Sequence, residues 1–174
     1  MSGALFLIVG PSGAGKDTLI AGARNYLSEG YAFPRRTITR PVQSGGEDHI
    51  AANVAAFEAQ ERAGAFALSW RAHGVAYGIP TNIVEYLANG THVVINVSRT
   101  VVADAKARFA PTRVILVTAS PTVLRERLQA RGREAPDGID ERLNRAQPVT
   151  ADAVVVNDGA LEPAVEAFVT ALKG

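Results

Sequence analysis

The sequence contains no cysteine, so it can form neither disulfide bonds nor thiolate metal sites. No apolar stretch approaches the roughly 20 residues that a membrane-spanning helix needs. Residues 4–9 are too short for a signal-peptide core and have no basic residues ahead of them. We also find no internal repeats and no low-complexity tract. For a chain of 174 residues with ordinary apolar and charged content, these absences favour one globular domain in the cytoplasm, away from membranes.

Lysine is scarce as well, because only Lys16, Lys106 and Lys173 accompany fifteen arginines. The net charge of +1 argues against a nucleic-acid partner, which would need a strongly basic surface. A GC-rich genome accounts for much of the arginine total, but not for its clustering. Because a guanidinium group recognises phosphate oxygens in a fixed, bidentate way, the clusters indicate a phosphorylated ligand.

Short β-branched runs alternate with longer amphipathic stretches. The runs predict buried strands of a parallel sheet at 4–9, 92–97, 113–118 and 153–156. Helices are expected at about 15–27, 99–109, 121–131, 139–147 and 160–172. The alternation predicts a doubly wound α/β fold, a parallel sheet flanked by helices, with ligands at the carboxyl ends of the strands.

Two segments interrupt this alternation. Residues 33–90 contain polar turns, an expected helix at 53–63 and a short strand near 65–70, which favours an inserted substrate lobe. Residues 131–138 are charged and punctuated by Gly and Pro, as a mobile flap would be. The expected division of the single domain is a core of 1–32, 91–130 and 139–174, an acceptor lobe of about 33–90, and a lid of about 131–138.

The stretch GPSGAGKDT lies between the first expected strand and the first expected helix. Gly10, Gly15 and Lys16 satisfy the phosphate-loop pattern G-x-x-x-x-G-K, which is strong in this strand–helix context. Such a loop directs backbone N–H groups and a helix N-terminus at phosphate oxygens, and its lysine bridges the β- and γ-phosphates of a nucleotide. The nucleotide-binding residues expected here are Gly10, Pro11, Ser12, Gly13, Ala14, Gly15, Lys16, Asp17 and Thr18.

Asp17 departs from this pattern, which has Ser or Thr after the lysine. A carboxylate beside a triphosphate would be repelled unless Mg²⁺ lies between them, and carboxylates are good Mg²⁺ ligands. We therefore predict a metal-binding role for Asp17, directly or through water. The alternative is that Asp17 only complements the positive end of the helix dipole.

Six arginines lie between residues 125 and 145, namely Arg125, Arg127, Arg131, Arg133, Arg142 and Arg145. We predict that Arg131 and Arg142 are catalytic and stabilise the charge on a transferring phosphoryl group. For Arg125, Arg127 and Arg145 a solvated helix face is the expectation, because acidic residues are close in sequence.

The segment RRTITRP predicts contacts to a phosphorylated acceptor through Arg36 and Arg40, whereas Arg35 can simply anchor the loop. Tyr77 is expected to donate a hydrogen bond to an acceptor phosphate; packing in the core is the alternative. None of the three histidines has metal-ligand spacing, and His92, which begins a strand, is expected to be structural.

The motifs GPSGAGK, TITRP…GGE, AYG, SPTVLRERLQARGRE, ERLNRA and VVNDG occur in the order seen in guanylate kinases and cover nearly the whole chain. The chain therefore resembles that family. The resemblance implies a P-loop nucleoside-monophosphate-kinase fold with ATP phosphates on the phosphate loop and lid roles for Arg131 and Arg142. It also implies that Asn157 and Asp158 lie near the adenine.

The residues that differ from the guanylate kinase pattern lie at the positions where that family binds GMP. By the resemblance, Leu68 stands where an acidic residue pairs with guanine, and Asn96 replaces an aspartate. His49 stands near the position of a phosphate-binding tyrosine, and Gln43 replaces an arginine. A missing hydrogen-bonding partner at a base-reading site can cost on the order of 10⁴-fold in discrimination, so GMP is a poor candidate.

The stretches GKD, FALSWRAHGVAYG and VINVSR are similar to those of the ribose 1,5-bisphosphate phosphokinases of phosphonate degradation. That resemblance implies transfer of the γ-phosphoryl group of ATP, with Mg²⁺, to ribose 1,5-bisphosphate, a phosphosugar, to form phosphoribosyl diphosphate. The alternatives are a guanylate kinase and a non-catalytic guanylate-kinase-like interaction module, although Lys16, Arg131 and Arg142 are all present. A GTPase is weaker still, and a homodimer is left open.

Overall fold

A computed structural model describes residues 2–42, 48–131 and 149–174, except for the side chain of Arg131. Its larger sheet is parallel and has the order β2-β7-β1-β8-β9, with β1 in the centre. These strands are β2 (Tyr31–Ala32), β7 (His92–Asn96), β1 (Leu5–Val9), β8 (Thr112–Thr118) and β9 (Ala153–Val156). The α/β fold and its four predicted strands are confirmed, and the two-residue edge strand β2 is an addition.

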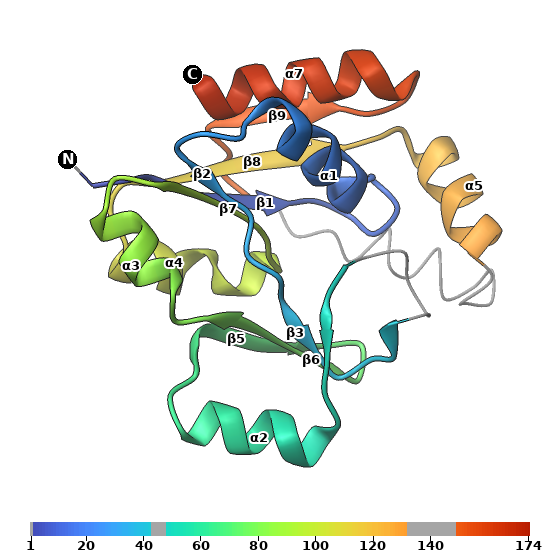
Figure 1. The fold of residues 1–174 in the computed structure, drawn as a ribbon. Coiled ribbons are helices and arrows are strands. Elements are labelled where there is room, and N and C mark those ends of the chain that lie inside the picture. Colours follow the sequence, from blue (N-terminus) through green and yellow to red (C-terminus); the bar gives the residue numbers. More distant parts are fainter. Residues whose placement is uncertain (1, 43–47, 132–148) are drawn as a thin grey trace.

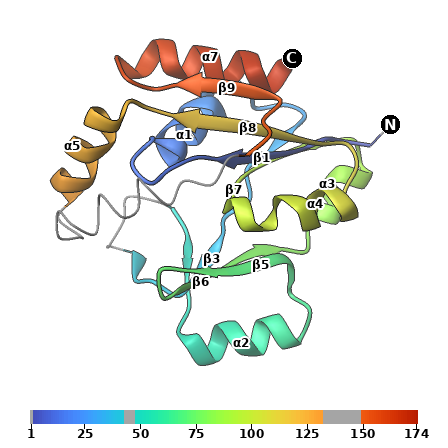
Figure 2. The ribbon, with the colours of Figure 1, turned by 180° about the vertical axis from the view of Figure 1, so that it is seen from behind.

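Helices cover both faces of the parallel sheet (Figures 1 and 2). On one face lie α1 (Lys16–Tyr26) and α7 (Leu161–Lys173), and on the other lie α3 (Ile83–Ala88) and α4 (Val102–Arg108). A short 3₁₀ turn, η2 (Arg99–Val101), leads into α4, and α5 (Pro121–Arg131) follows β8. The predicted helices are confirmed apart from 139–147, which lies outside the described residues; α3 was not predicted.

The central strand β1 is buried along its whole length because both of its faces are covered. Phe6 and Ile8 face the apolar cluster that contains α1 and α7. Leu5, Leu7 and Val9 face a second cluster on the opposite side. Alternate residues thus serve two cores, which is why the strand reads as a continuous apolar run.

The inserted segment forms a sheet of its own, in the order β4-β3-β6-β5. Its strands are β3 (Thr37–Ile38), β4 (Ile50–Ala51), β5 (Phe66–Ala72) and β6 (Val75–Pro80). Helix α2 (Val54–Arg62) covers the outer face of this sheet (Figure 1). The inner face packs through Leu68, Trp70 and Ile79 into the same cluster as Leu5 and Leu7. The helix and β5 were expected, whereas the sheet was not.

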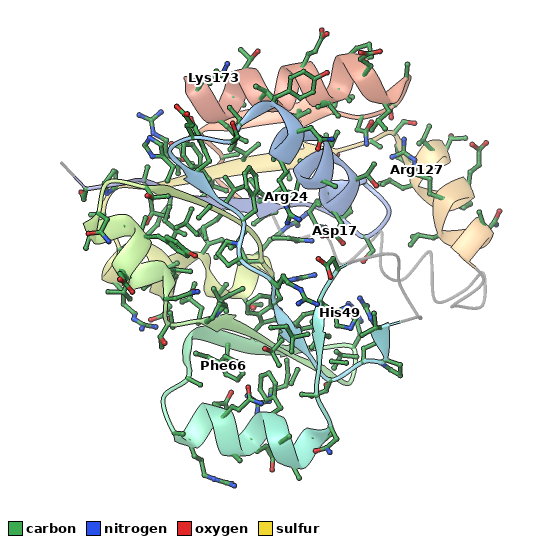
Figure 3. The ribbon with its side chains drawn as sticks, in the orientation of Figure 1. Asp17, Arg24, His49, Phe66, Arg127 and Lys173 are labelled. Carbon is green, nitrogen blue, oxygen red and sulfur yellow. The ribbon has the colours of Figure 1, made fainter. Side chains whose placement is uncertain are left out.

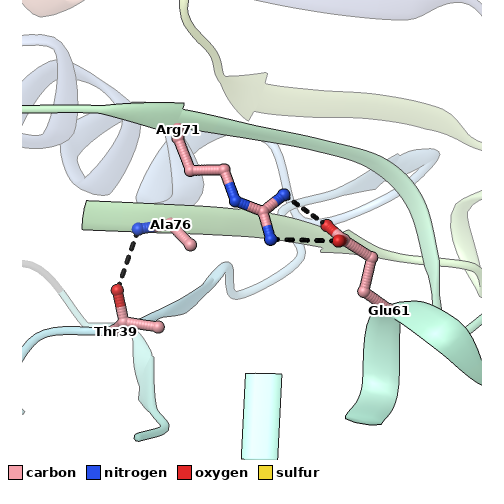
Figure 4. A network of polar contacts seen from close by, with 4 residues as sticks. All are labelled: Thr39, Glu61, Arg71 and Ala76. Carbon is pink, nitrogen blue, oxygen red and sulfur yellow. Dashed lines mark hydrogen bonds and ion pairs between the residues drawn. The ribbon is translucent and has the colours of Figure 1, made fainter. Parts of the chain in front are cut away.

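A salt bridge attaches α2 to the second sheet (Figure 4). The Arg71 guanidinium donates to both carboxylate oxygens of Glu61, at 2.8 and 3.0 Å. This hydrogen bonding lowers the pKa of Glu61. In the same view, the hydroxyl oxygen of Thr39 accepts a hydrogen bond from the Ala76 amide at 2.8 Å. The first contact holds α2 against the edge strand β5, and the second joins the ends of the inner strands β3 and β6.

Gly78 on β6 leaves room for an aromatic ring. A Cβ at this position would lie 2.6 Å from Phe66 ring atoms, and that ring stacks on Phe57 at a centroid distance of 4.8 Å. We therefore expect Gly78→Ala to lower the free energy of unfolding by about 1–3 kcal/mol, measured by denaturant titration. As the control, Gly159→Ala meets open space and should change it by less than about 0.5 kcal/mol. Equal effects of the two substitutions would contradict this account.

In the described part of the chain, no helix is both long and apolar enough to cross a membrane.

Candidate functional site

The loop between β1 and α1 has the backbone conformation that its glycines predict. Gly13 and Gly15 have φ values of 87° and 89°, in the left-handed region that favours glycine. Gly15 is the N-cap of α1, and no side chain caps that helix. The first N–H groups of a helix have no intrahelical partner, and glycine at the N-cap offers them no side-chain acceptor, so this end of α1 can receive an anion.

Lys16 folds back over this loop. Its ammonium group donates to the carbonyl oxygens of Gly10 at 2.6 Å and Pro11 at 3.2 Å. The predicted role of Lys16, bridging the β- and γ-phosphates in catalysis, stays a prediction.

Two side chains from distant parts of the sequence bind the backbone of this loop. Asn157, which follows β9 and is 5% exposed, donates to the carbonyl of Ala14 at 2.9 Å. Arg127 on α5 donates to the carbonyls of Gly13 at 3.1 Å and Asn157 at 2.7 Å. A Cβ on Gly15 would lie 2.4 Å from the Asn157 amide nitrogen, so glycine is required there. The loops after β1 and β9 and helix α5 thus form one hydrogen-bonded unit.

The expectation that Arg127 belongs to a solvated helix face was wrong. Its guanidinium points from α5 toward the phosphate loop, where backbone carbonyls need a donor (Figure 3). The sequence spacing could have indicated this orientation. Arg127 is three residues after Leu124 and so lies on the same face of the helix, and Leu124 is buried against the same loop. Arg125, in contrast, is exposed.

The predicted nucleotide residues Asn157 and Asp158 lie close to the loop. The Asn157 amide is used by the loop backbone, and Asp158 accepts a hydrogen bond from the Ser120 amide at 2.5 Å. Asp158 thereby connects the segments that follow β8 and β9. Contact of either residue with an adenine base stays a prediction.

Asp17 lies in the first turn of α1, on the side that faces the second sheet (Figure 3). One carboxylate oxygen accepts a hydrogen bond of 2.8 Å from the side-chain amide of Asn96. Asn96 ends β7, the strand that pairs with β1, and it is 9% exposed. Thr18 is exposed beside it. The metal role of Asp17 stays a prediction.

Arg36 and Tyr77 come together between the two sheets. The Arg36 guanidinium lies 5.1 Å from the centre of the Tyr77 ring and donates to the backbone carbonyl of Asn96 at 3.1 Å. On its own sheet, Tyr77 stacks on Trp70 with a centroid distance of 5.2 Å and an angle of 5° between the planes. Arg36 is 8% exposed, so a cation is held inside the site by an aromatic face and a carbonyl.

His49 also belongs to the acceptor-binding residues that the sequence predicts, and this role stays a prediction. Its side chain is fully buried, and Nε2 is 2.8 Å from the carbonyl oxygen of Arg40. The carbonyl of His49 itself accepts from Arg35, which also pairs with Asp48 at 3.1 Å. In this structure His49 holds the turn that carries Arg40 and has no exposed surface for a ligand.

Leu68 is 2% exposed, and it pairs with Ile79 in the register of β5 and β6. It belongs to the apolar cluster between the sheets. The position that the family resemblance assigns to a guanine-binding acid is thus filled by packed hydrocarbon. Gln43 lies outside the described residues.

The structure does not describe the side chain of Arg131 or any part of Arg142, Arg133 or Arg145. The catalytic predictions for Arg131 and Arg142 therefore stay predictions. Arg99, to which the sequence analysis assigned no role, begins η2 three residues after Asn96, at the same end of the sheet. Burial lowers the pKa of Arg99, but a guanidinium group remains protonated at neutral pH.

We expect Arg127→Ala to loosen the phosphate loop. Two backbone carbonyls would lose a charged donor, so the free energy of unfolding should fall by about 1.5–3 kcal/mol. Affinity for ADP, measured by calorimetry, should fall with it. Gln129→Ala, an exposed change on the same helix, is the control and should alter neither quantity. Unchanged ADP affinity in Arg127→Ala would show that the loop keeps its shape without this contact.

Comparison with known proteins gives consistent results. The guanylate kinase family model matches residues 2–174. The ribose 1,5-bisphosphate phosphokinase PhnN of Chromobacterium violaceum is 45% identical, covering 99% of this chain and 95% of the relative. The enzyme of the same name from Acidiphilium cryptum is 53% identical, with 96% and 91% covered.

A longer relative is the bifunctional ribose 1,5-bisphosphokinase-thymidine phosphorylase of Roseobacter denitrificans, which is 43% identical over the whole chain. The chain spans only 27% of that relative's length. Among solved structures, guanylate kinase from Anaplasma phagocytophilum superimposes with a TM-score of 0.75 at 18% identity, covering 99% of this chain and 85% of its own. At that identity the likeness concerns the fold.

Proposed function

We propose that this chain converts ribose 1,5-bisphosphate to phosphoribosyl diphosphate. The premise is that the chain belongs to the guanylate kinase family and, within it, to the ribose 1,5-bisphosphate phosphokinases. The donor in this proposal is ATP, and the setting is phosphonate breakdown in the cytoplasm. The observation that carries it is the acceptor side of the site, where Arg36 is a buried cation and Leu68 is packed hydrocarbon. A phosphosugar needs a cation such as Arg36 to bind its phosphates. It carries no nucleobase, so the site needs no residue that recognises one.

On the donor side, the phosphate loop would bind the ATP phosphates through its backbone amides and the N-terminus of α1. Lys16 would exchange its hydrogen bonds to Gly10 and Pro11 for bonds to the β- and γ-phosphates. Asn157 and Asp158 would lie toward the adenine. Because Asn157 also holds the loop backbone, base and phosphates would be positioned by one connected unit.

The residues present fit Mg²⁺, which is usually held by one or two carboxylates together with substrate phosphates and water. The described residues contain no group of three or more acidic or histidine side chains, so an all-protein cage is not found there. Asp17 offers one carboxylate directly after Lys16. We propose that Asp17 holds the ion, whose charge would neutralise the phosphates during transfer.

On the acceptor side, Arg36 and Arg40 would bind the phosphates of the sugar, and the Tyr77 hydroxyl would donate to one of them. Since His49 is buried against the Arg40 carbonyl, it would act by positioning Arg40. We also propose the division into a core, an acceptor lobe of about 33–90 and a lid of about 131–138, and the separate sheet β4-β3-β6-β5 supports the acceptor lobe. Arg131, at the end of α5, and Arg142 would reach the transferring group.

The chemistry requires no general base. An anionic oxygen of the 1-phosphate attacks the γ-phosphorus of ATP, the bond from that phosphorus to the β,γ-bridging oxygen breaks, and ADP leaves. Because the attacking oxygen carries no proton, the residues have to align the two substrates and neutralise charge. Lys16, Arg36, Arg40 and the proposed lid arginines would supply positive charge for this.

The test supplies purified protein and ATP–Mg²⁺ with either ribose 1,5-bisphosphate or GMP, and follows the diphosphate product by ³¹P NMR. We expect the diphosphate signal with the phosphosugar and little turnover of GMP. Turnover of GMP alone would establish the second candidate, a guanylate kinase, which the family model favours but Leu68 disfavours. Turnover of neither would favour a non-catalytic interaction module.

A further inference from the structure

Two separate departures from the guanylate kinase pattern meet in this structure. Asp17 stands where the phosphate loop ordinarily has a hydroxyl, and Asn96 stands where the resemblance places an aspartate. They are 79 residues apart in sequence, yet the Asn96 amide lies 2.8 Å from a carboxylate oxygen of Asp17. The two changes therefore form one contact.

The polarity of this contact is set by chemistry. A carboxylate only accepts hydrogen bonds, so the amide must present its NH₂ group to it. Among the described residues, the other carboxylate oxygen of Asp17 has no hydrogen-bond partner. Asn96 thus holds one oxygen of the carboxylate and leaves the second available.

Asn96 is itself held in place. It ends a strand whose residues pair with β1, in the register Ile8 to Asn96. It is 9% exposed, and its backbone carbonyl accepts the Arg36 guanidinium at 3.1 Å. Asp17, by contrast, is exposed on the first turn of a helix. The contact therefore joins an exposed carboxylate to a fixed point in the sheet.

We infer that Asn96 is a positioning residue for the metal–nucleotide complex, and that Asp17 and Asn96 exchange the usual places of the acid and its neutral partner. The site keeps one negative charge, moved from the strand end to the phosphate-loop helix. This inference rests on the proposed function of Asp17, and it does not depend on the identity of the acceptor.

The test measures how much a divalent ion improves nucleotide binding, without any acceptor present. The readout is the Kd of a non-hydrolysable ATP analogue in EDTA divided by its Kd with Mn²⁺, with bound Mn²⁺ followed by electron paramagnetic resonance. Three variants are compared with the unaltered chain, namely Asp17→Asn, Asn96→Leu and the exchanged pair Asp17→Asn with Asn96→Asp. All three preserve approximate side-chain volume and the backbone carbonyl that binds Arg36.

We expect Asn96→Leu to lower this ratio by about 10–100-fold, the range found when outer partners of metal ligands are removed, and Asp17→Asn to lower it at least as much. The exchanged pair should recover most of the loss, because it restores one carboxylate and one amide in the same contact. Asn25→Leu, an exposed change on α1, is the matched control and should leave the ratio unchanged.

Retention of the full ratio in Asn96→Leu would overturn the positioning role. An exchanged pair as weak as Asp17→Asn would overturn the exchange. If Asn96→Leu fails to fold, the exchanged pair remains informative because both of its side chains stay polar. If the proposed acceptor is incorrect, ribose 1,5-bisphosphate will not be turned over, but the nucleotide-binding ratio will be unaffected. Failure of the proposed function can therefore be distinguished from failure of the Asn96 inference.

Discussion

Lys16→Met should lower kcat/KM for phosphoryl transfer by on the order of 10²–10³-fold, the usual cost of removing one preorganised electrostatic contact to a transition state. Methionine fills similar space but carries no charge, so the γ-phosphoryl oxygens would lose their nearest loop cation. The loss should be concentrated in kcat, because charge on the leaving and transferring groups develops during the reaction.

The measurement for Lys16 pairs steady-state kinetics with thermal unfolding. Since Lys16 also bonds the carbonyls of Gly10 and Pro11, the unfolding curve separates a weakened loop from lost catalysis. Lys106→Met, an exposed change on α4, supplies the control and should retain full activity. If folded Lys16→Met enzyme kept the kcat of the unaltered enzyme, the proposed catalytic role of Lys16 in the phosphate loop would be contradicted.

Arg36→Lys is the second large effect, although it keeps the charge. The planar guanidinium lies against the Tyr77 ring and reaches the Asn96 carbonyl, and a lysine ammonium cannot match both contacts. We expect kcat/KM for the phosphosugar to fall by about 10²-fold through misplacement of the acceptor. The Kd for ATP should change far less, since the phosphate loop is intact.

The two substrates are varied separately to read this result. A rise confined to the acceptor KM would support an acceptor-phosphate role for Arg36. Arg62→Lys, exposed at the end of α2 in the same inserted segment, serves as the comparison and should match the unaltered enzyme. An equal loss of ATP affinity in Arg36→Lys would instead assign Arg36 to the architecture of the whole site.

Local patterns predicted the parts of the molecule that local physics determines. The apolar run at 4–9 and the glycine phasing up to Gly15 predicted β1, the phosphate loop and the start of α1, and each was found. Strand β2 has only two residues and is a strand because it pairs with β7 at His92. A segment this short has no hydrophobic periodicity from which a strand could be predicted. The second sheet likewise depends on pairing between distant short segments.

The site shows the same division. Gly15 and Lys16 could be assigned from their spacing alone, because the phosphate loop is a contiguous motif. The function of Arg127 depends on where α5 meets the loop, 114 residues away from Gly13. The burial of His49 likewise follows from tertiary packing, which residue-by-residue resemblance does not contain. Pairing of Asp17 with Asn96 required the register between β1 and β7.

Asn96 belongs to both halves of the site at once, since its carbonyl serves Arg36 and its amide serves Asp17. The first atom belongs to the backbone and the second to the side chain, so a displacement of the Asn96 backbone would alter both contacts. Thermodynamic reciprocity then applies: if binding of the phosphosugar shifts Arg36, the affinity for metal–nucleotide changes by a certain factor, and metal–nucleotide changes the affinity for the sugar by the same factor. In that case Asn96 would be the residue through which the two substrates influence each other.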